Sequence, residues 1–143
     1  MRIEFTVYGK PLGKQRHRDG NGKHYTPKQT EDRENLIKWS YKKECGNYRF
    51  PDKTPLDLRV YAYFPIPKST SKLNRQKMID GEIRPTVVPD YDNIAKIVSD
   101  ALNGIAYDDD RCVVDSMQRK FYGEIPRTVI IIQEAKSPER SKQ

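Results

Sequence analysis

The alternation of apolar and polar positions along the chain predicts four β-strands. Apolar residues occupy every second position over residues 2–8 and again over residues 56–64, which is the period of a strand with one buried face. Residues 112–123 and 128–134 are also predicted to be strands, joined by a turn that contains glycine and proline. The polar face of residues 56–64 carries two tyrosines, so we expect part of that face to be covered.

A first helix is predicted after a glycine-rich segment. Thr26 is a suitable N-cap, Pro27 suits the first helical position, and Gln29 completes a capping box three residues after the cap. Gly46 is the expected stop. The apolar face of this helix includes Trp39, which we expect to lie in the core rather than to stack on a nucleic-acid base.

Two further helices are predicted before the last strands. Residues 69–80 form a short polar helix, and a third helix begins at Asp92 or Asn93 as N-cap and closes at Asn103 and Gly104. The core-facing stripe of this third helix is Ile94, Ile97, Val98, Ala101 and Leu102. The resulting order, β-α-β-α-α-β-β, predicts one small α/β domain over residues 1–134, with a four-stranded mixed sheet flanked by helices. The polar tail, residues 135–143, is predicted to be disordered.

The segment between the first strand and the first helix is predicted to be a basic loop. It shows no hydrophobic period and carries three glycines. Its candidate DNA-binding residues are Lys10, Lys14, Arg16, Arg18 and Lys23. A loop of this kind can follow a phosphate backbone without reading sequence. The alternative is a solvated loop, and we favour phosphate contact.

Composition and charge extend this interpretation to the whole chain. The 143 residues carry a net charge of +7, and a basic chain favours a polyanionic partner, although surface lysines that serve solubility would give the same sum. No apolar stretch is long enough to span a bilayer, and no signal peptide is recognisable, so a cytoplasmic protein is expected. Cys45 and Cys112 have no zinc-finger spacing, which favours reduced thiols.

Acidic residues gather in one stretch of this basic chain. Residues 89–110 contain six aspartates and a single lysine. Asp90 and Asp92 lie two positions apart, so extended backbone would direct both carboxylates to the same side. Asp92, Lys96 and Asp100 follow at spacings of four, which places them together on a helix face away from the core.

This stretch predicts a divalent-metal site. Asp108, Asp109 and Asp110 would repel one another, and the pKa of at least one would rise without a cation nearby. Mg²⁺ takes carboxylate oxygens, water and substrate phosphate oxygens, and can activate bound water. Lys96 could stabilise charge on the scissile phosphate. Taken singly, Asp92 could be only an N-cap and residues 108–110 only a solvated turn.

The text PDYDNIAKIVSDALNG followed by DDDRCVVD resembles the RusA-like Holliday junction resolvases. The resemblance implies a RusA-like fold and a magnesium-dependent endonuclease, with Mn²⁺ as a substitute, that cuts four-way DNA junctions as a homodimer in recombination and repair. It also implies a bacterial or prophage origin. The family's metal ligands fall on Asp90, Asp92 and Asp110, or on Asp109 under a one-residue shift, and its essential lysine falls on Lys96.

Two other functions remain open from the sequence. One is a protein that binds branched DNA but has lost catalysis. The other is a small metal-dependent phosphatase or nucleotide hydrolase, which the charge of +7 and the long basic loop disfavour because they suit a longer polyanion.

Overall fold

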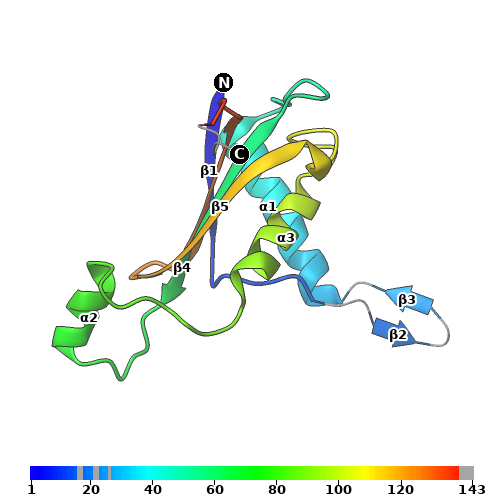
Figure 1. The fold of residues 1–143 in the computed structure, drawn as a ribbon. Helices are drawn as coiled ribbons and strands as arrows, with labels where there is room; N and C mark the ends of the chain where they lie inside the picture. Colours follow the sequence, from blue (N-terminus) through cyan, green and yellow to red (C-terminus); the bar gives the residue numbers. More distant parts are fainter. Residues whose placement is uncertain (16–17, 21–22, 26, 139–143) are drawn as a thin grey trace, which may run out of the picture.

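A mixed four-stranded sheet forms the frame of the molecule in the computed structural model, which describes residues 1–15, 18–20, 23–25 and 27–138 (Figure 1). The sheet consists of β1 (Arg2–Tyr8), β4 (Leu56–Pro65), β5 (Val113–Gly123) and β6 (Arg127–Glu134). Its strand order is β1-β6-β4-β5, with β4 and β5 parallel and the other pairs antiparallel. The parallel pair requires a crossover, and the chain between β4 and β5 makes it through two helices, one of which forms part of the site.

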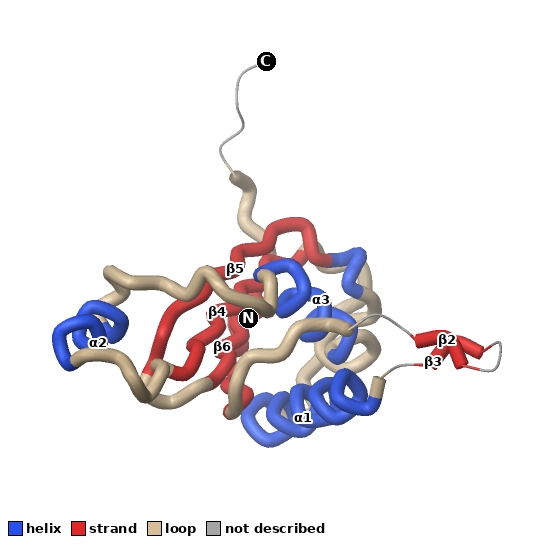
Figure 2. Tube along the Cα trace, turned by 90° about the horizontal axis from the view of Figure 1, so that it is seen from below, coloured by secondary structure: helices blue, strands red, loops and turns tan. Residues whose placement is uncertain are grey.

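Two helices cover one face of this sheet. Figure 2 shows α1 (Lys28–Cys45) and α3 (Tyr91–Ala101) on the same side of the strands, while α2 (Lys72–Ile79) stands apart. The core between sheet and helices is apolar, and its largest fully buried side chains are Tyr41, Tyr107, Phe5, Phe50, Phe64, Ile37, Leu56, Leu58, Ile97, Leu102, Ile130 and Ile132. The predicted α/β fold class is confirmed, and so is the predicted order of the three helices and the four strands of this sheet.

The basic segment holds a structure that the sequence did not predict. Within it, β2 (Arg18–Gly20) and β3 (Lys23–Tyr25) pair as a small antiparallel hairpin beside the main body (Figure 1). Three-residue strands are too short for a hydrophobic period to reveal, so the pattern indicated only a loop.

The start of α1 also differs from the prediction. Thr26, the expected N-cap, lies outside the described residues, and the helix has Pro27 as N-cap without a side-chain hydrogen bond. The predicted capping box involves Thr26 and so also lies outside the described residues, while Gln29 Oε1 accepts a hydrogen bond from Gln15 Nε2 at 2.7 Å. The helix is therefore linked through Gln29 to the segment that leads into the hairpin.

The prediction that Trp39 lies in the core is wrong, since 59% of this residue is exposed. The buried stripe of α1 instead includes Thr30, Arg33, Ile37 and Tyr41, which recur at helical spacing on the sheet side. Trp39 lies two positions from Ile37, roughly 200° around the helix, and therefore faces outward. The apolar residues of α1 lie on both its sheet-facing and its solvent-facing side, so their positions in the sequence did not show which side the sheet covers.

The two tyrosines on the outer face of β4 are partly covered, as predicted. Arg119 and Arg127 place their guanidinium groups over Tyr61 and Tyr63, at 5.9 and 3.9 Å from the ring centroids. Phe121 stacks on Tyr63 with centroids 5.4 Å apart. The cover comes from side chains of neighbouring strands, through cation–π and aromatic contacts.

Candidate active site

Helix α3 carries two of the predicted site residues, Asp92 and Lys96. Its N-cap is Asp90, so the predicted cap at Asp92 or Asn93 is wrong by two or three positions, and Asp92 lies in the first turn. The Asp90 carbonyl accepts a hydrogen bond from the backbone N–H of Ile94 at 3.1 Å, which begins the helix earlier than the side chains indicated. The predicted core stripe is confirmed, and because it faces the sheet, the opposite side of α3 faces solvent.

The start of β5 brings a second carboxylate to α3. Residues Asp110–Cys112 form a short 3-10 turn before the strand, and the side-chain oxygen of Asn103 accepts the backbone N–H of Asp110 at 2.8 Å. The β4–β5 register shifts next to Leu56, where Val114 is the extra residue. A bulge at a strand start changes the direction of the chain, and this one lies four residues after Asp110.

These elements place three of the four predicted catalytic residues around one pocket. Asp92, Lys96 and Asp110 line an open pocket of about 310 Å³. Its other lining residues are Leu58, Ala95, Ser99, Val113, Ser116 and Gln118. The pocket is shallow and faces solvent, as a site for a polymer backbone requires.

Asp90 lies at a neighbouring pocket rather than in this one. That pocket, of about 340 Å³, is lined by Asp90 and Asn93 together with Lys10 and Lys14. In the described part of the chain, no three acidic, histidine or cysteine side chains gather closely enough to hold a metal ion. Asp90, Asp92 and Asp110 do not form such a group among the described residues, and their role as metal ligands stays a prediction.

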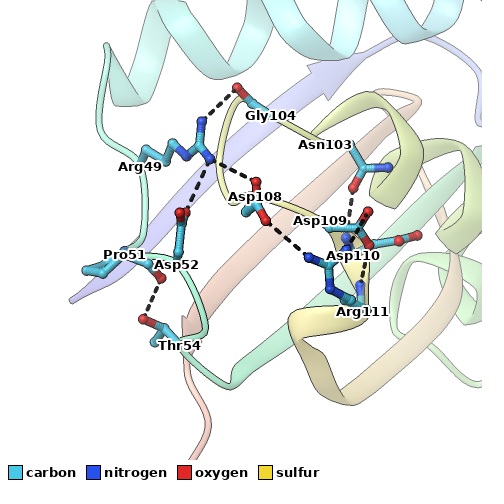
Figure 3. Close-up of polar contacts among 10 residues, drawn as sticks. All are labelled: Arg49, Pro51, Asp52, Thr54, Asn103, Gly104, Asp108, Asp109, Asp110 and Arg111. Carbon is cyan, nitrogen blue, oxygen red and sulfur yellow. Dashed lines mark hydrogen bonds and ion pairs between the residues drawn. The ribbon is translucent and has the colours of Figure 1, made fainter.

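The three consecutive aspartates have different surroundings, which Figure 3 shows. Asp108 pairs with Arg49 and with Arg111, at 3.3 Å in each case, and Asp109 pairs with Arg111 at 3.2 Å. A hydrogen bond from the Arg111 backbone N–H lowers the pKa of Asp109. Two arginines therefore offset repulsion among these carboxylates, which the sequence analysis expected a metal ion to relieve.

Asp110 is the carboxylate of this run that lacks an arginine partner among the described residues. Burial raises the pKa of Asp110, and a hydrogen bond with the Asp109 carboxyl raises it further, while Lys96 opposes the rise. A cation at the pocket would favour the charged form. Asp92 and Asp110 together offer the one or two carboxylates that Mg²⁺ usually takes from protein, so the donor set fits a hard divalent ion.

Lys96 is held by a chain of ion pairs that crosses three elements. Its Nζ lies 3.2 Å from Asp100 Oδ1, and Lys14 Nζ lies 3.2 Å from the other oxygen, Asp100 Oδ2. Lys14 also pairs with Glu34 of α1 at 3.2 Å. The hydrogen bond to Asp100 raises the pKa of Lys96, and the charge of Asp100 adds to the effect. The sequence spacing indicated Asp100 as a neighbour of Lys96, but not Lys14.

The segment before the hairpin is fixed against the start of α3. The backbone N–H of Lys14 donates to the Asn93 carbonyl at 3.0 Å. At Gly13 a Cβ would lie 2.9 Å from Asn93 Cβ and 3.0 Å from Pro89 Cβ, so only glycine fits without a shift. The basic segment is therefore fixed to α3 beside the pocket.

The predicted DNA-binding residues have different positions. Lys10 is exposed beside Asp90, whereas Lys14 is half-buried in its two ion pairs. Arg16 lies outside the described residues. Arg18 and Lys23 lie on β2 and β3, and their side chains lie outside the described part. DNA contact by this segment stays a prediction.

The family follows from comparison with known proteins. Residues 8–133 match the family described as "Endodeoxyribonuclease RusA". The chain belongs to this family. The RusA match runs from the last residue of β1 almost to the end of β6, so it includes Asp92, Lys96 and Asp110. It supports endodeoxyribonuclease activity on DNA junctions.

A curated relative aligns with nearly the whole chain. The chain is 36% identical over 136 residues to "Uncharacterized protein YqaN" of Bacillus subtilis (strain 168), an alignment that covers 92% of this chain and 96% of the relative. Within the described residues, none of the helices is both long and apolar enough to cross a membrane.

Proposed function

We propose that this RusA-family protein is a divalent-metal-dependent endodeoxyribonuclease that resolves four-way DNA junctions as a homodimer. The observation that carries the proposal is the meeting of Asp92, Lys96 and Asp110 around one open pocket in a basic protein. Two carboxylates and an ammonium group suit a phosphodiester, because one part of the site can hold a cation while the other binds phosphate oxygens.

The metal would be Mg²⁺, with Mn²⁺ as a substitute. Asp92 and Asp110 would hold it, with Asp90 as the third predicted ligand from the neighbouring pocket. When bound, such an ion supplies Lewis acidity to the phosphate and lowers the pKa of its water.

The residues of the chain do the remaining work. Lys96 is 57% exposed at its side chain and keeps its charge through Asp100, so its ammonium group can bind a phosphate oxygen at the rim. That contact stabilises negative charge as it develops on the phosphate. Ser116 and Gln118 offer hydroxyl and amide groups on the pocket wall to orient the backbone.

The first test compares cleavage by the wild type and by Asp92→Asn. With a synthetic four-way junction and Mg²⁺, the wild type should give paired incisions, and Asp92→Asn should lose at least 100-fold in rate, roughly 3 kcal/mol of transition-state stabilisation. EDTA should abolish cutting and Mn²⁺ should restore it. The measurement is single-turnover cleavage resolved on a denaturing gel.

Asp32→Asn is the matched control, since Asp32 is an exposed aspartate near the start of α1 and is not among the residues that line the pocket. It should cut as the wild type does. Metal-independent junction binding without any product would instead support the inactive DNA-binding alternative. Release of phosphate from nucleotides, with junctions left intact, would favour a small-molecule hydrolase.

A further inference from the structure

The chain between β4 and α3 forms an arm that the site does not use. This α2 arm, residues 66–85, carries α2 on the side of the molecule away from the β2–β3 hairpin (Figures 1 and 2). None of the residues of α2 is buried. Its helix is stabilised locally, because Ser71 Oγ caps it by accepting the backbone N–H of Asn74 at 3.2 Å. An arm that buries no side chain of its helix must serve something other than the core.

The charge of the α2 arm is basic and largely uncompensated. Its five basic residues are Lys68, Lys72, Arg75, Lys77 and Arg84, against the acids Asp80 and Glu82. Arg75 lies 4.0 Å from Glu124, but Lys68, Lys72 and Lys77 have no ion pair within the described part of the chain. Like charges one turn apart weaken a short helix slightly. A polyanion bound to the arm would remove that repulsion.

Specific contacts fix the α2 arm to strand β5. Arg84 Nε donates to the Lys120 carbonyl at 3.0 Å, and its guanidinium lies 4.5 Å from the centroid of Phe121. Lys120 Nζ in turn donates to the carbonyl of Val87. The arm is therefore fixed on the strand that also forms a wall of the catalytic pocket.

Strand β5 connects the pocket to the arm in one continuous line. Ser116 and Gln118 line the pocket and point to the helix side of the sheet, and Lys120, two residues further, donates to the Val87 carbonyl just after the arm. The Arg75 guanidinium of α2 lies 4.0 Å from Glu124, the residue after the end of β5 at Gly123. At roughly 3.3 Å per residue, Ser116 and Gly123 are about 23 Å apart along the strand. That length corresponds to about seven nucleotides of one DNA strand at roughly 3.4 Å each.

We propose that the α2 arm is a second DNA-binding surface, which holds the phosphate backbone about seven nucleotides from the phosphate in the catalytic pocket. The inference rests on the proposed function for its ligand, a DNA duplex arm. Lys72, Arg75 and Lys77 bind phosphates without reading bases. With the hairpin on the other side of the pocket, the arm gives the protein two basic projections.

The test is a triple variant, Lys72→Gln, Arg75→Gln and Lys77→Gln, measured for junction binding in EDTA so that no cutting occurs. Each lost phosphate contact removes about 0.9 from the slope of log affinity against log salt, so the slope should become shallower by about 2 to 3. The matched control is Lys38→Gln, Lys42→Gln and Lys43→Gln on α1, which packs over β1 at the opposite edge of the sheet from β5. The control triple should keep the wild-type slope.

Ethylation interference on the same junction locates the contact. The wild type should lose binding when phosphates about seven nucleotides from the cleaved position are ethylated, and the α2-arm variant should not respond to ethylation there. An unchanged slope, or an equal change in both triples, overturns the proposal. A shift of the α2-arm variant from dimer to monomer in light scattering also overturns it, because the arm would then bind a second copy.

The outcomes separate this inference from the proposed function. Binding is measured without metal, so a wild type that binds junctions through the arm but never cuts them leaves the arm supported and the nuclease refuted. A wild type that cuts, with an arm variant of unchanged salt slope, refutes only the arm.

Discussion

Asp100 joins Lys96, the proposed catalytic lysine, to the rest of the protein. Each of its carboxylate oxygens lies 3.2 Å from a different lysine, Lys96 on one side and Lys14 on the other. The Asp100 side chain is 20% exposed. An ion pair with this much cover holds its partners in place better than an exposed pair does. Asp100 is therefore a positioning residue, which acts through Lys96 rather than on the phosphate.

Replacing Asp100 by asparagine should lower kcat about 10-fold and leave KM nearly unchanged. The amide keeps the volume but loses the charge that fixes Lys96, and a small displacement of a catalytic group is costly in rate. Steady-state cleavage of a four-way junction measures both constants. Asp100→Glu, which restores the charge, should recover part of kcat.

Asp57→Asn is the comparison for this variant. Asp57 is similarly covered and pairs with Arg59 at 3.3 Å, but the pair lies on the sheet face away from the helices. It should leave kcat unchanged even if both variants lose some stability. Equal losses of kcat in Asp100→Asn and Asp57→Asn would show that Asp100 matters only for folding.

For single residues, the sequence predicted which side chains belong to the candidate site better than it predicted their contact partners. The spacing of Asp92, Lys96 and Asp100 along a helix was enough to place them on one face. The Arg49 partner of Asp108 could not be predicted, because Arg49 comes from a distant turn and meets Asp108 only in the folded chain. The same limit applies to Lys14, because its partner Asp100 lies 86 positions later in the sequence.

Among the elements, α3 has two roles that require opposite faces. Its inner face packs against the sheet, and its outer face presents Asp92 and Lys96 to the pocket. Packing of the inner face therefore fixes the position of the catalytic groups. The strength of that packing can be measured separately from activity.

Ile97→Ala should reduce the free energy of unfolding by about 2 to 5 kcal/mol. Ile97 is 1% exposed, and the change leaves a cavity in addition to removing apolar contact. Urea denaturation followed by circular dichroism measures the change. Ile79→Ala at the end of α2 is the matched control, since Ile79 is 40% exposed and should cost less than about 0.5 kcal/mol. Similar losses at the two positions would contradict the placement of α3 in the core and α2 outside it.

Helices and strands were predicted correctly where the periodic pattern of apolar residues extended over many residues, and were missed where the element was short. The seven-residue alternation of β1 and the stripe of α3 each contain enough turns or repeats to fix type and face. The β2–β3 pairing and the bulge at Val114 depend on single residues and on tertiary hydrogen bonds, so no local pattern announces them. The outward position of Trp39 belongs to the same class, because the sheet selects which stripe of α1 it covers.

On the scale of the whole molecule, the described part of the chain places the proposed catalytic pocket between two basic projections. The hairpin lies on one side of α3 and the α2 arm on the other (Figures 1 and 2). A four-way junction presents two equivalent strands related by two-fold symmetry. A symmetric dimer would supply two such pockets with the same relation.

The proposed dimer predicts the products of a mixed assembly. In a heterodimer of wild-type and Asp92→Asn subunits, purified through two different tags, only one pocket should cut, so a plasmid that extrudes a cruciform should be nicked. The wild-type homodimer carrying the same two tags should linearise the plasmid, because its two pockets cut symmetric strands in one encounter. Agarose electrophoresis separates nicked from linear DNA, and light scattering verifies the dimer mass. A monomer that linearises the plasmid, or a heterodimer that does so as fast as the wild type, would refute two cooperating sites and leave each chain a nuclease that acts alone.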